Sequence, residues 1–178
     1  VLLESIIKNI STETTFNPNG PITIDIPGSK PWVVDNYGGE KFQEPLNPIN
    51  IVDATIHSVN VVYAQLVMQV GAENVEKLLN NMNISDIGSN PAIALGGLEK
   101  GITPLDVSKI FTTIASGGVY HEPVCILKIT DSSGNVLFEY DPQNSPSTKR
   151  IFEEPQAFLA TQILQRVITE GTGKAAGI

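Results

Sequence analysis

The sequence predicts an α+β domain that is dominated by helices and contains one short β-hairpin. Apolar side chains recur three or four residues apart in several separate segments, which is the spacing of a helix with one buried face. Alternating apolar residues on both sides of a polar turn, within residues 124–140, predict the hairpin. With 178 residues, of which 41% are hydrophobic, the chain is long enough for one core, so we expect one domain over residues 1–178.

The first 48 residues predict one short helix and then a long irregular segment. The apolar stripe of the helix consists of Leu3, Ile6, Ile7 and Ile10. This stripe puts Ser5 and Lys8 on the opposite, solvent-facing side of the helix. Residues 14–48, which we call the excursion, contain much of the Pro and Gly and only short alternating pieces, so we expect exposed loops with small strands. We expect Trp32 and Tyr37 to anchor the excursion, with a substrate groove as the alternative.

Helices follow one another closely in the middle of the chain. Asn50 with an acid three residues later predicts a helix start. A further helix, with the stripe Val59, Val62, Tyr63, Leu66 and Val70, ends at Gly71. The next helix begins directly, and its stripe consists of Val75, Leu78, Leu79 and Met82.

The last third predicts two more helices on either side of the hairpin. Thr103-Pro104-Leu105-Asp106 combines a capping threonine, a proline at the first helical position and an acid at the third. The stripe that follows consists of Val107, Ile110, Phe111 and Ile114. Strands at 124–130 and 136–140 pair across residues 131–135. Pro155 opens the final helix, whose stripe consists of Ala160, Ile163, Leu164 and Val167.

Composition excludes several classes of function. Lys and Arg number only 11 against a net charge of −8, so the chain lacks the basic face that nucleic-acid binding requires. The single Cys125 can form neither an internal disulfide nor a thiolate zinc site, so metal chemistry built on cysteine is excluded. No apolar run reaches the roughly 20 residues that cross a bilayer.

The candidate catalytic residues are Ser58 and Asn60. Residues two apart diverge on a helix, so these side chains can converge only from a turn between two helices, which is where the pattern places them. A hydroxyl beside a carboxamide could relay a proton and hold an amide substrate. The pattern alone is weak, because Ser133-Gly134-Asn135 repeats it where a β-turn favours small polar residues. Ser58 could also simply cap a helix.

Ordered blocks around this pair strengthen the functional interpretation. Residues 56–62, 71–75, 94–97, 101–107, 115–120 and 170–176 resemble, in that order, the transpeptidase domain of class A penicillin-binding proteins. The resemblance implies the fold shared by these enzymes and serine β-lactamases. It also implies three motifs: Ser-x-x-Lys with the nucleophile and its base, Ser-x-Asn, and Lys-Thr-Gly on a strand beside the cleft.

The implied activity is that of a peptidoglycan D,D-transpeptidase. Such an enzyme forms a serine ester with a stem peptide ending in D-Ala-D-Ala, passes it to an amine, and is acylated by β-lactams on the same serine. By the resemblance, Ser58 would help to move the proton between base and leaving amine, and Asn60 would hold the base lysine and the substrate carbonyl. The resemblance implies no metal and no organic cofactor. The parent would act on the extracytoplasmic face of the bacterial membrane and carry a membrane anchor and a glycosyltransferase domain upstream.

The other two motifs have no match in the expected context. Ser5-x-x-Lys8 fits the letters of the first, but an exposed lysine stays charged and cannot act as base, so we expect the nucleophile to precede Val1. Thr172-Gly173-Lys174 has the wrong order and follows a helix, so we expect Lys-Thr-Gly after Ile178. Residues 1–178 would then be a partial domain that is inactive alone and either associates with another chain or exposes apolar surface.

His57 adjoins Ser58, but adjacent residues seldom form a nucleophile and base pair, so we interpret it as a packed or surface imidazole. Two alternative functions stay open. A non-catalytic transpeptidase-like binding module would lack a Ser-x-x-Lys motif upstream, whereas a β-lactam sensor or β-lactamase-like domain would lack the glycosyltransferase.

Overall fold

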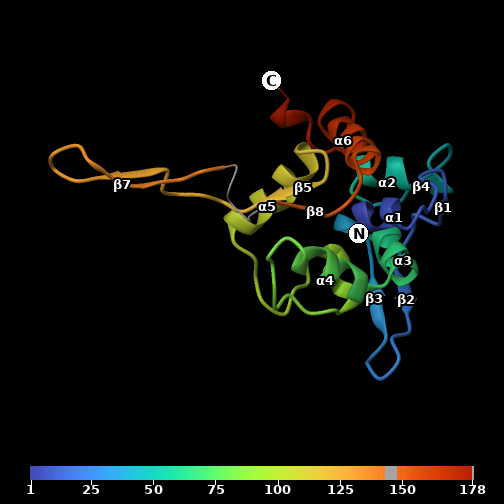
Figure 1. Cartoon of the computed structure of the whole chain (residues 1–178). Coiled ribbons are helices and arrows are strands. Elements are labelled where there is room, and N and C mark those ends of the chain that lie inside the picture. Colours follow the sequence, from blue (N-terminus) through green and yellow to red (C-terminus); the bar gives the residue numbers. More distant parts are fainter. Residues whose placement is uncertain (143–147, 178) are drawn as a thin grey trace.

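The computed structural model describes residues 1–142 and 148–177 and has the predicted mixture of helices and short strands (Figure 1). The α-helices are α1 (Leu2–Ile7), α2 (Ile51–Ile56), α3 (Asn60–Val70), α4 (Ala72–Asn80), α5 (Pro104–Ala115) and α6 (Glu154–Thr169). Short 3-10 helices are η1 (Tyr37–Gly39), η2 (Pro91–Leu95) and η3 (Lys174–Ala176). The strands are β1 (Thr15–Phe16), β2 (Ile22–Ile24), β3 (Trp32–Val34), β4 (Ile49–Asn50), β5 (Val119–His121), β6 (Lys128–Thr130), β7 (Val136–Glu139) and β8 (Thr148–Arg150).

The core forms around α3. This helix contacts α1, α2, α4 and η2, while α6 packs across α1 and α2. Most of its side chains are buried, namely Val61, Val62, Ala64, Leu66, Val67 and Val70. A helix that is buried on most of its surface carries apolar residues on nearly all sides. For this reason the apolar residues of α3 are not confined to one narrow stripe. The start of α3, which bears Asn60, is therefore held by a rigid core.

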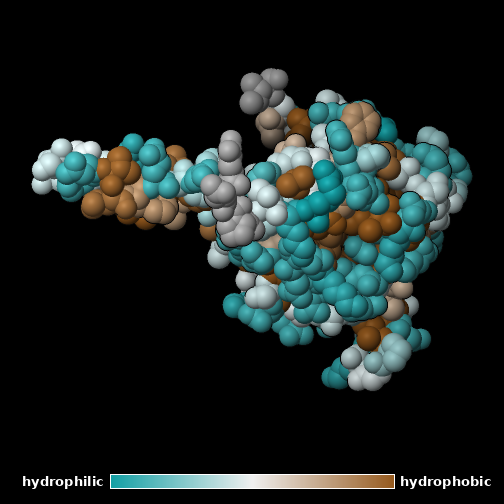
Figure 2. Space-filling view, in the orientation of Figure 1, coloured by the Kyte–Doolittle hydropathy of each residue, from teal (hydrophilic) through white to brown (hydrophobic). Residues whose placement is uncertain are grey.

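Strands pair two by two rather than forming one large sheet. The antiparallel pairs are β1 with β4, β2 with β3, β5 with β8, and β6 with β7. The β6–β7 pair is the predicted hairpin, although its first strand begins at Lys128 rather than at residue 124. It projects away from the body of the molecule (Figure 1). All of its strand residues are exposed. The apolar ones among them are therefore visible on its surface in Figure 2.

Helix ends follow the predicted chemistry. The Asn50 side chain accepts a hydrogen bond from the Asp53 amide at 2.8 Å and caps α2. Thr103 and Asp106 form a reciprocal capping box at the start of α5. Gly71 ends α3 with a φ of 84°, a conformation that glycine adopts without steric cost.

Three predictions about the environment of side chains are wrong. Ser5 is fully buried instead of facing solvent, because its hydroxyl donates to the Leu2 carbonyl at 2.7 Å and so needs no water. Tyr37 is 91% exposed and anchors nothing, although Trp32 does pack against the core. On α5, Phe111 is 55% exposed, and much of the apolar stripe faces outward with it.

An apolar groove of about 530 Å³ lies between α5 and α6. Its lining includes Phe111, Leu164 and Ile168. Association with another chain through such apolar surface stays a prediction. No helix within the described residues has the length and apolar character needed to traverse a bilayer.

Candidate active site

The turn between α2 and α3 presents both predicted residues. His57 ends α2, Val59 precedes the first residue of α3, and Asn60 is that first residue. Ser58 lies between the helices with a φ of 56°, in the left-handed region that costs a residue other than glycine about 1–3 kcal/mol. This conformation is common in the residue that follows a helix end, and the amides of Ser58 and Val59 close α2 by donating to the carbonyls of Thr55, at 3.2 Å, and Ala54, at 2.9 Å.

Ser58 and Asn60 line the same pocket, which has a volume of about 420 Å³. Ser58 is exposed and Asn60 is half-buried. Three further polar residues line it, namely Thr55, Tyr63 and Thr172. Residues from η2 and α6 supply an apolar wall that consists of Ala94, Leu95, Leu164 and Val167. The convergence expected from the sequence is therefore present, while the catalytic roles of the two residues stay a prediction.

Asn36, in the excursion, holds the start of α3 from a distance. Its buried side chain accepts a hydrogen bond from the Val61 amide at 3.2 Å. Its amide group donates to the carbonyls of Pro18, at 2.7 Å, and Glu40, at 3.1 Å. Val59 at the N-cap has no side-chain acceptor, so Asn36 replaces the missing cap. Sequence reasoning missed this residue, because a cap 25 positions away leaves no local signal.

The excursion also restrains the carboxamide of Asn60. Its Nδ2 atom donates to the Asp35 carbonyl at 3.4 Å. A carboxamide has two N–H donors and an oxygen that accepts two hydrogen bonds, so one donor and the oxygen stay available for a ligand. Asn60 can therefore hold a carbonyl and a cation at the same time.

Residues 170–174 pack against the end of α2, next to the turn that bears Ser58. The Thr172 amide donates to the Ile56 carbonyl at 3.2 Å, and a Cβ on Gly171 would lie only 2.2 Å from that carbonyl oxygen. Arg166 bridges Glu170 at 2.9 Å and Asp53 of α2 at 3.7 Å. Hydrogen bonds from Arg166 lower the pKa of Glu170. Only a glycine at position 171 lets this backbone approach the Ile56 carbonyl so closely. The one sequence feature that pointed to Gly171 was its place in the 170–176 block.

His57 is a packed imidazole, as predicted. It is half-buried, and its ring centre lies 6.2 Å from that of Phe42 with the rings tilted at 60°. The second Ser-x-Asn sequence, at 133–135, serves the hairpin turn: the Asp131 carboxylate accepts from the amides of Ser133, at 2.8 Å, and Asn135, at 2.9 Å. It lies on the exposed hairpin, and none of the pockets described here includes it.

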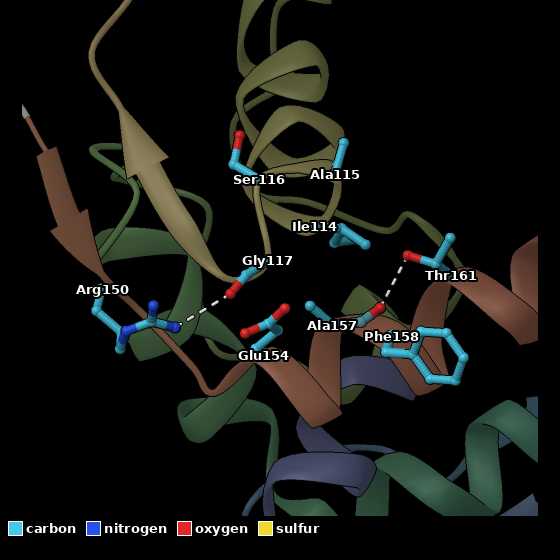
Figure 3. A pocket seen from close by; sticks show the side chains of 9 residues that line it. All are labelled: Ile114, Ala115, Ser116, Gly117, Arg150, Glu154, Ala157, Phe158 and Thr161. Atoms are coloured by element: carbon cyan, nitrogen blue, oxygen red, sulfur yellow. Dashed lines mark hydrogen bonds between the residues drawn. The ribbon is translucent and has the colours of Figure 1, made fainter.

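Another pocket, of about 460 Å³, lies where the end of α5 meets the first turns of α6 (Figure 3). The Arg150 guanidinium at its edge donates to the carbonyls of Gly117 and Phe152, both at 3.1 Å. Because that arginine ties β8 to neighbouring backbone, we interpret this pocket as a structural junction. Within residues 1–142 and 148–177, no three His, Cys, Asp or Glu side chains gather as metal ligands would.

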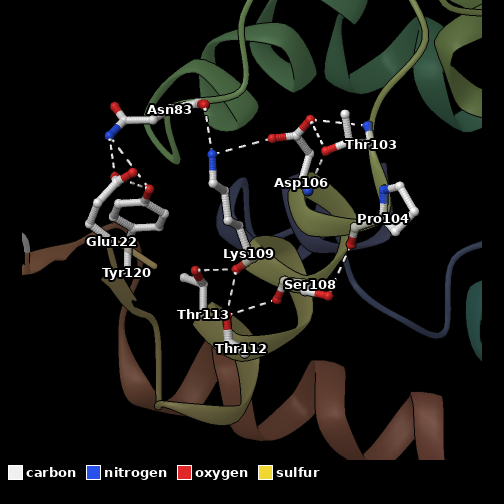
Figure 4. Close-up of polar contacts among 10 residues, drawn as sticks. All are labelled: Asn83, Thr103, Pro104, Asp106, Ser108, Lys109, Thr112, Thr113, Tyr120 and Glu122. Carbon is white, nitrogen blue, oxygen red and sulfur yellow. Dashed lines mark hydrogen bonds and ion pairs between the residues drawn. The ribbon is translucent and has the colours of Figure 1, made fainter. Parts of the chain in front are cut away.

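A polar cluster joins the loop after α4 to α5 and to the end of β5 (Figure 4). The Tyr120 hydroxyl donates to the Glu122 carboxylate, which also accepts from Asn83 at 2.8 Å. Lys109 bridges Asp106 and donates to the Asn83 carbonyl at 3.3 Å. Burial, together with the neighbouring Glu122, raises the pKa of Tyr120 to about 12. The hydrogen bond from Tyr120 lowers the pKa of Glu122.

Comparison with known proteins identifies the family of the chain. Residues 12–178 match the family model described as the penicillin binding protein transpeptidase domain. Penicillin-binding protein 1F of Bacillus subtilis is 30% identical over 162 residues, which are 90% of this chain and 21% of that protein. Penicillin-binding protein 1B of Haemophilus influenzae is 30% identical over 88% of this chain and 19% of its own length. The chain thus spans about a fifth of these relatives.

Solved structures share the fold. Penicillin-binding protein 1A from Haemophilus influenzae superposes with a TM-score of 0.82 at 21% identity, over 97% of this chain and 30% of that one. The D,D-transpeptidase domain of a peptidoglycan glycosyltransferase from Eggerthella lenta gives 0.75 at 20% identity, over 99% and 48%. The predicted fold class is confirmed. The chain belongs to the family of penicillin-binding protein transpeptidase domains.

Proposed function

We propose that this chain contributes Ser58 and Asn60 to the active site of a peptidoglycan D,D-transpeptidase that works through a serine acyl-enzyme. The observation that carries the proposal is that both side chains line one pocket at the turn between α2 and α3. Membership of the transpeptidase family supports the class of reaction. The protein would act on stem peptides and β-lactams at the extracytoplasmic face of the membrane, held there by an anchor outside these residues.

Acyl transfer requires a nucleophile that this pocket does not itself show. A serine oxygen attacks the carbonyl of the penultimate D-Ala, the bond to the terminal D-Ala breaks, and that residue leaves as an amine after gaining a proton. A second stem peptide then attacks the ester with its own amine and releases the serine. Ser5 does not suit the first step, because it is buried and its hydroxyl is bonded to the Leu2 carbonyl. We therefore do not assign the nucleophile to Ser5.

The two pocket residues would serve the proton and the substrate. The Ser58 hydroxyl both donates and accepts, so it can pass a proton from the base to the departing amine. The Asn60 oxygen would accept from the lysine, and its free N–H would donate to the substrate carbonyl.

Acylation by a fluorescent penicillin tests the proposal in the product of the whole reading frame. Ser58→Ala should slow acylation by about 10²–10⁴-fold, the usual value of a positioned proton-transfer group. Ser133→Ala, at the other Ser-x-Asn sequence, is a matched control and should leave the rate unchanged. Equal rates for the two variants would remove Ser58 from the mechanism, and a wild-type protein that forms no adduct would favour a non-catalytic binding module.

A further inference from the structure

Two hydroxyl groups meet across the turn that bears Ser58. Thr55 lies on α2 and Tyr63 on α3, and their oxygens are 2.8 Å apart. Ser58 and Asn60 lie between them in the sequence, and all four residues line the same pocket. The contact therefore links the two helices directly behind the candidate active-site residues.

The direction of this hydrogen bond follows from counting protons. A threonine hydroxyl has one proton, and that of Thr55 is donated to the Ile51 carbonyl at 2.7 Å. Thr55 can therefore only accept from Tyr63, so the phenol must be the donor. Burial raises the pKa of Tyr63 to about 12, which keeps this proton in place throughout the neutral range. Tyr63 is therefore the donor to Thr55 across the neutral pH range.

We propose that Tyr63 is a positioning residue, whose hydrogen bond to Thr55 holds α3 against α2 and thereby sets how Ser58 and Asn60 face the pocket. Its effect on acylation rests on the function proposed above. The helix α2 has only six residues, and a helix this short depends on tertiary contacts for its orientation. Ser58 follows directly on this helix and its amide donates to the Thr55 carbonyl, so the direction of the turn depends on how α2 is held.

Other contacts restrain different parts of the turn. The backbone of Ser58 and Val59 is bonded to Thr55 and Ala54 of α2, at 3.2 and 2.9 Å. Asn36 holds the first turn of α3 against the excursion. Neither restraint links a side chain of α2 to one of α3, so without the Tyr63 hydroxyl the angle between these helices loses a specific determinant.

Hydrogen–deuterium exchange tests positioning without any activity. Tyr63→Phe removes the hydroxyl alone, and Tyr37→Phe, at a 91% exposed tyrosine, is the control. The amides of Ser58 and Val59 should exchange about 2- to 12-fold faster in Tyr63→Phe, the factor that corresponds to one ordinary hydrogen bond. A purely structural role would instead speed exchange throughout α2 and α3.

Acylation by fluorescent penicillin, in the product of the whole reading frame, supplies the second readout. The rate constant for acylation should fall by about 2- to 12-fold in Tyr63→Phe, while the initial affinity and the fraction of protein that reacts stay the same. Loss of folded protein would lower the reactive fraction and leave the rate constant unchanged. Thr55→Val breaks the same hydrogen bond from the other side, and the double variant should be no slower than either single one.

The outcomes separate the two claims. Unchanged exchange at Ser58 and Val59, or faster exchange with an unchanged acylation rate constant, overturns the role of Tyr63 and leaves that of Ser58 intact. A wild-type protein that penicillin does not acylate overturns the proposed function, and the exchange comparison then decides alone whether Tyr63 positions the turn. Should Tyr63→Phe fail to fold, Thr55→Val provides the same comparison.

Discussion

Replacing Asn36 with alanine should destabilise the protein far more than its place in a loop-rich segment suggests. The variant removes a buried carboxamide that bonds to Val61, Pro18 and Glu40. One of these hydrogen bonds is the substitute cap of α3, on the helix whose first residue is Asn60. The change therefore affects both the excursion and the candidate active site.

The expected magnitude follows from these contacts. Three hydrogen bonds of about 1 kcal/mol each are lost, and the Val61 amide is left buried without a partner, at a further cost of about 1–3 kcal/mol. Water that enters the vacated space would recover part of this, so we expect a loss of about 2–4 kcal/mol in the free energy of unfolding. For a protein of this size, the melting temperature should fall by about 5–15 °C.

Thermal and urea unfolding measure the effect. Asn80→Ala, at an exposed asparagine at the end of α4, is the matched control and should stay within about 0.5 kcal/mol of the wild type. Penicillin acylation of Asn36→Ala should slow as well, because the first turn of α3 is released. A melting temperature for Asn36→Ala that matches the control would refute the assignment of Asn36 as a remote cap.

Two further predictions concern the surroundings of the pocket and the polar cluster. Gly171→Ala should lower both stability and penicillin acylation, because its Cβ would collide with the Ile56 carbonyl, whereas Gly101→Ala meets nothing within 4 Å and should be neutral in the same assays. The pKa of Glu122 is lowered in the folded protein by the hydrogen bond from Tyr120, so its contribution to stability is present above its unfolded pKa and is lost as pH falls through the folded pKa. Melting temperatures recorded from pH 7 downward should therefore decline less steeply for Glu122→Gln, and identical slopes would contradict this linkage.

Helix ends were predictable because their chemistry is local. Thr103 and Asp106 lie within one turn of each other, and so do Asn50 and Asp53, so short sequence patterns specify both caps. The turn at Ser58 was predictable for a similar reason, since two helical stripes end and begin around it. Its resemblance to a known family then supplied a chemical meaning that the tripeptide alone lacks.

Long-range contacts were not predictable from these patterns. Asn36 and Val61 are 25 positions apart, and a polar residue in a loop reads as exposed unless its partners are known. The burial of Ser5 was not predicted, because the position of a helix face was inferred from its apolar residues alone. A small hydroxyl can also lie on the buried face when it forms a hydrogen bond within its own helix, as Ser5 does. The outward-facing Phe111 shows the converse, since apolar spacing predicts a helix face and leaves open what covers it.

The projecting β6–β7 hairpin is the part of the molecule where we expect changes of sequence to be tolerated best. Its tip is held by bonds among its own residues, chiefly Asp131 with Ser133 and Asn135. Sequence drift, lengthening or an inserted affinity tag at that tip would thus be absorbed locally. We therefore expect an insertion at this tip to leave the fold of the body unchanged.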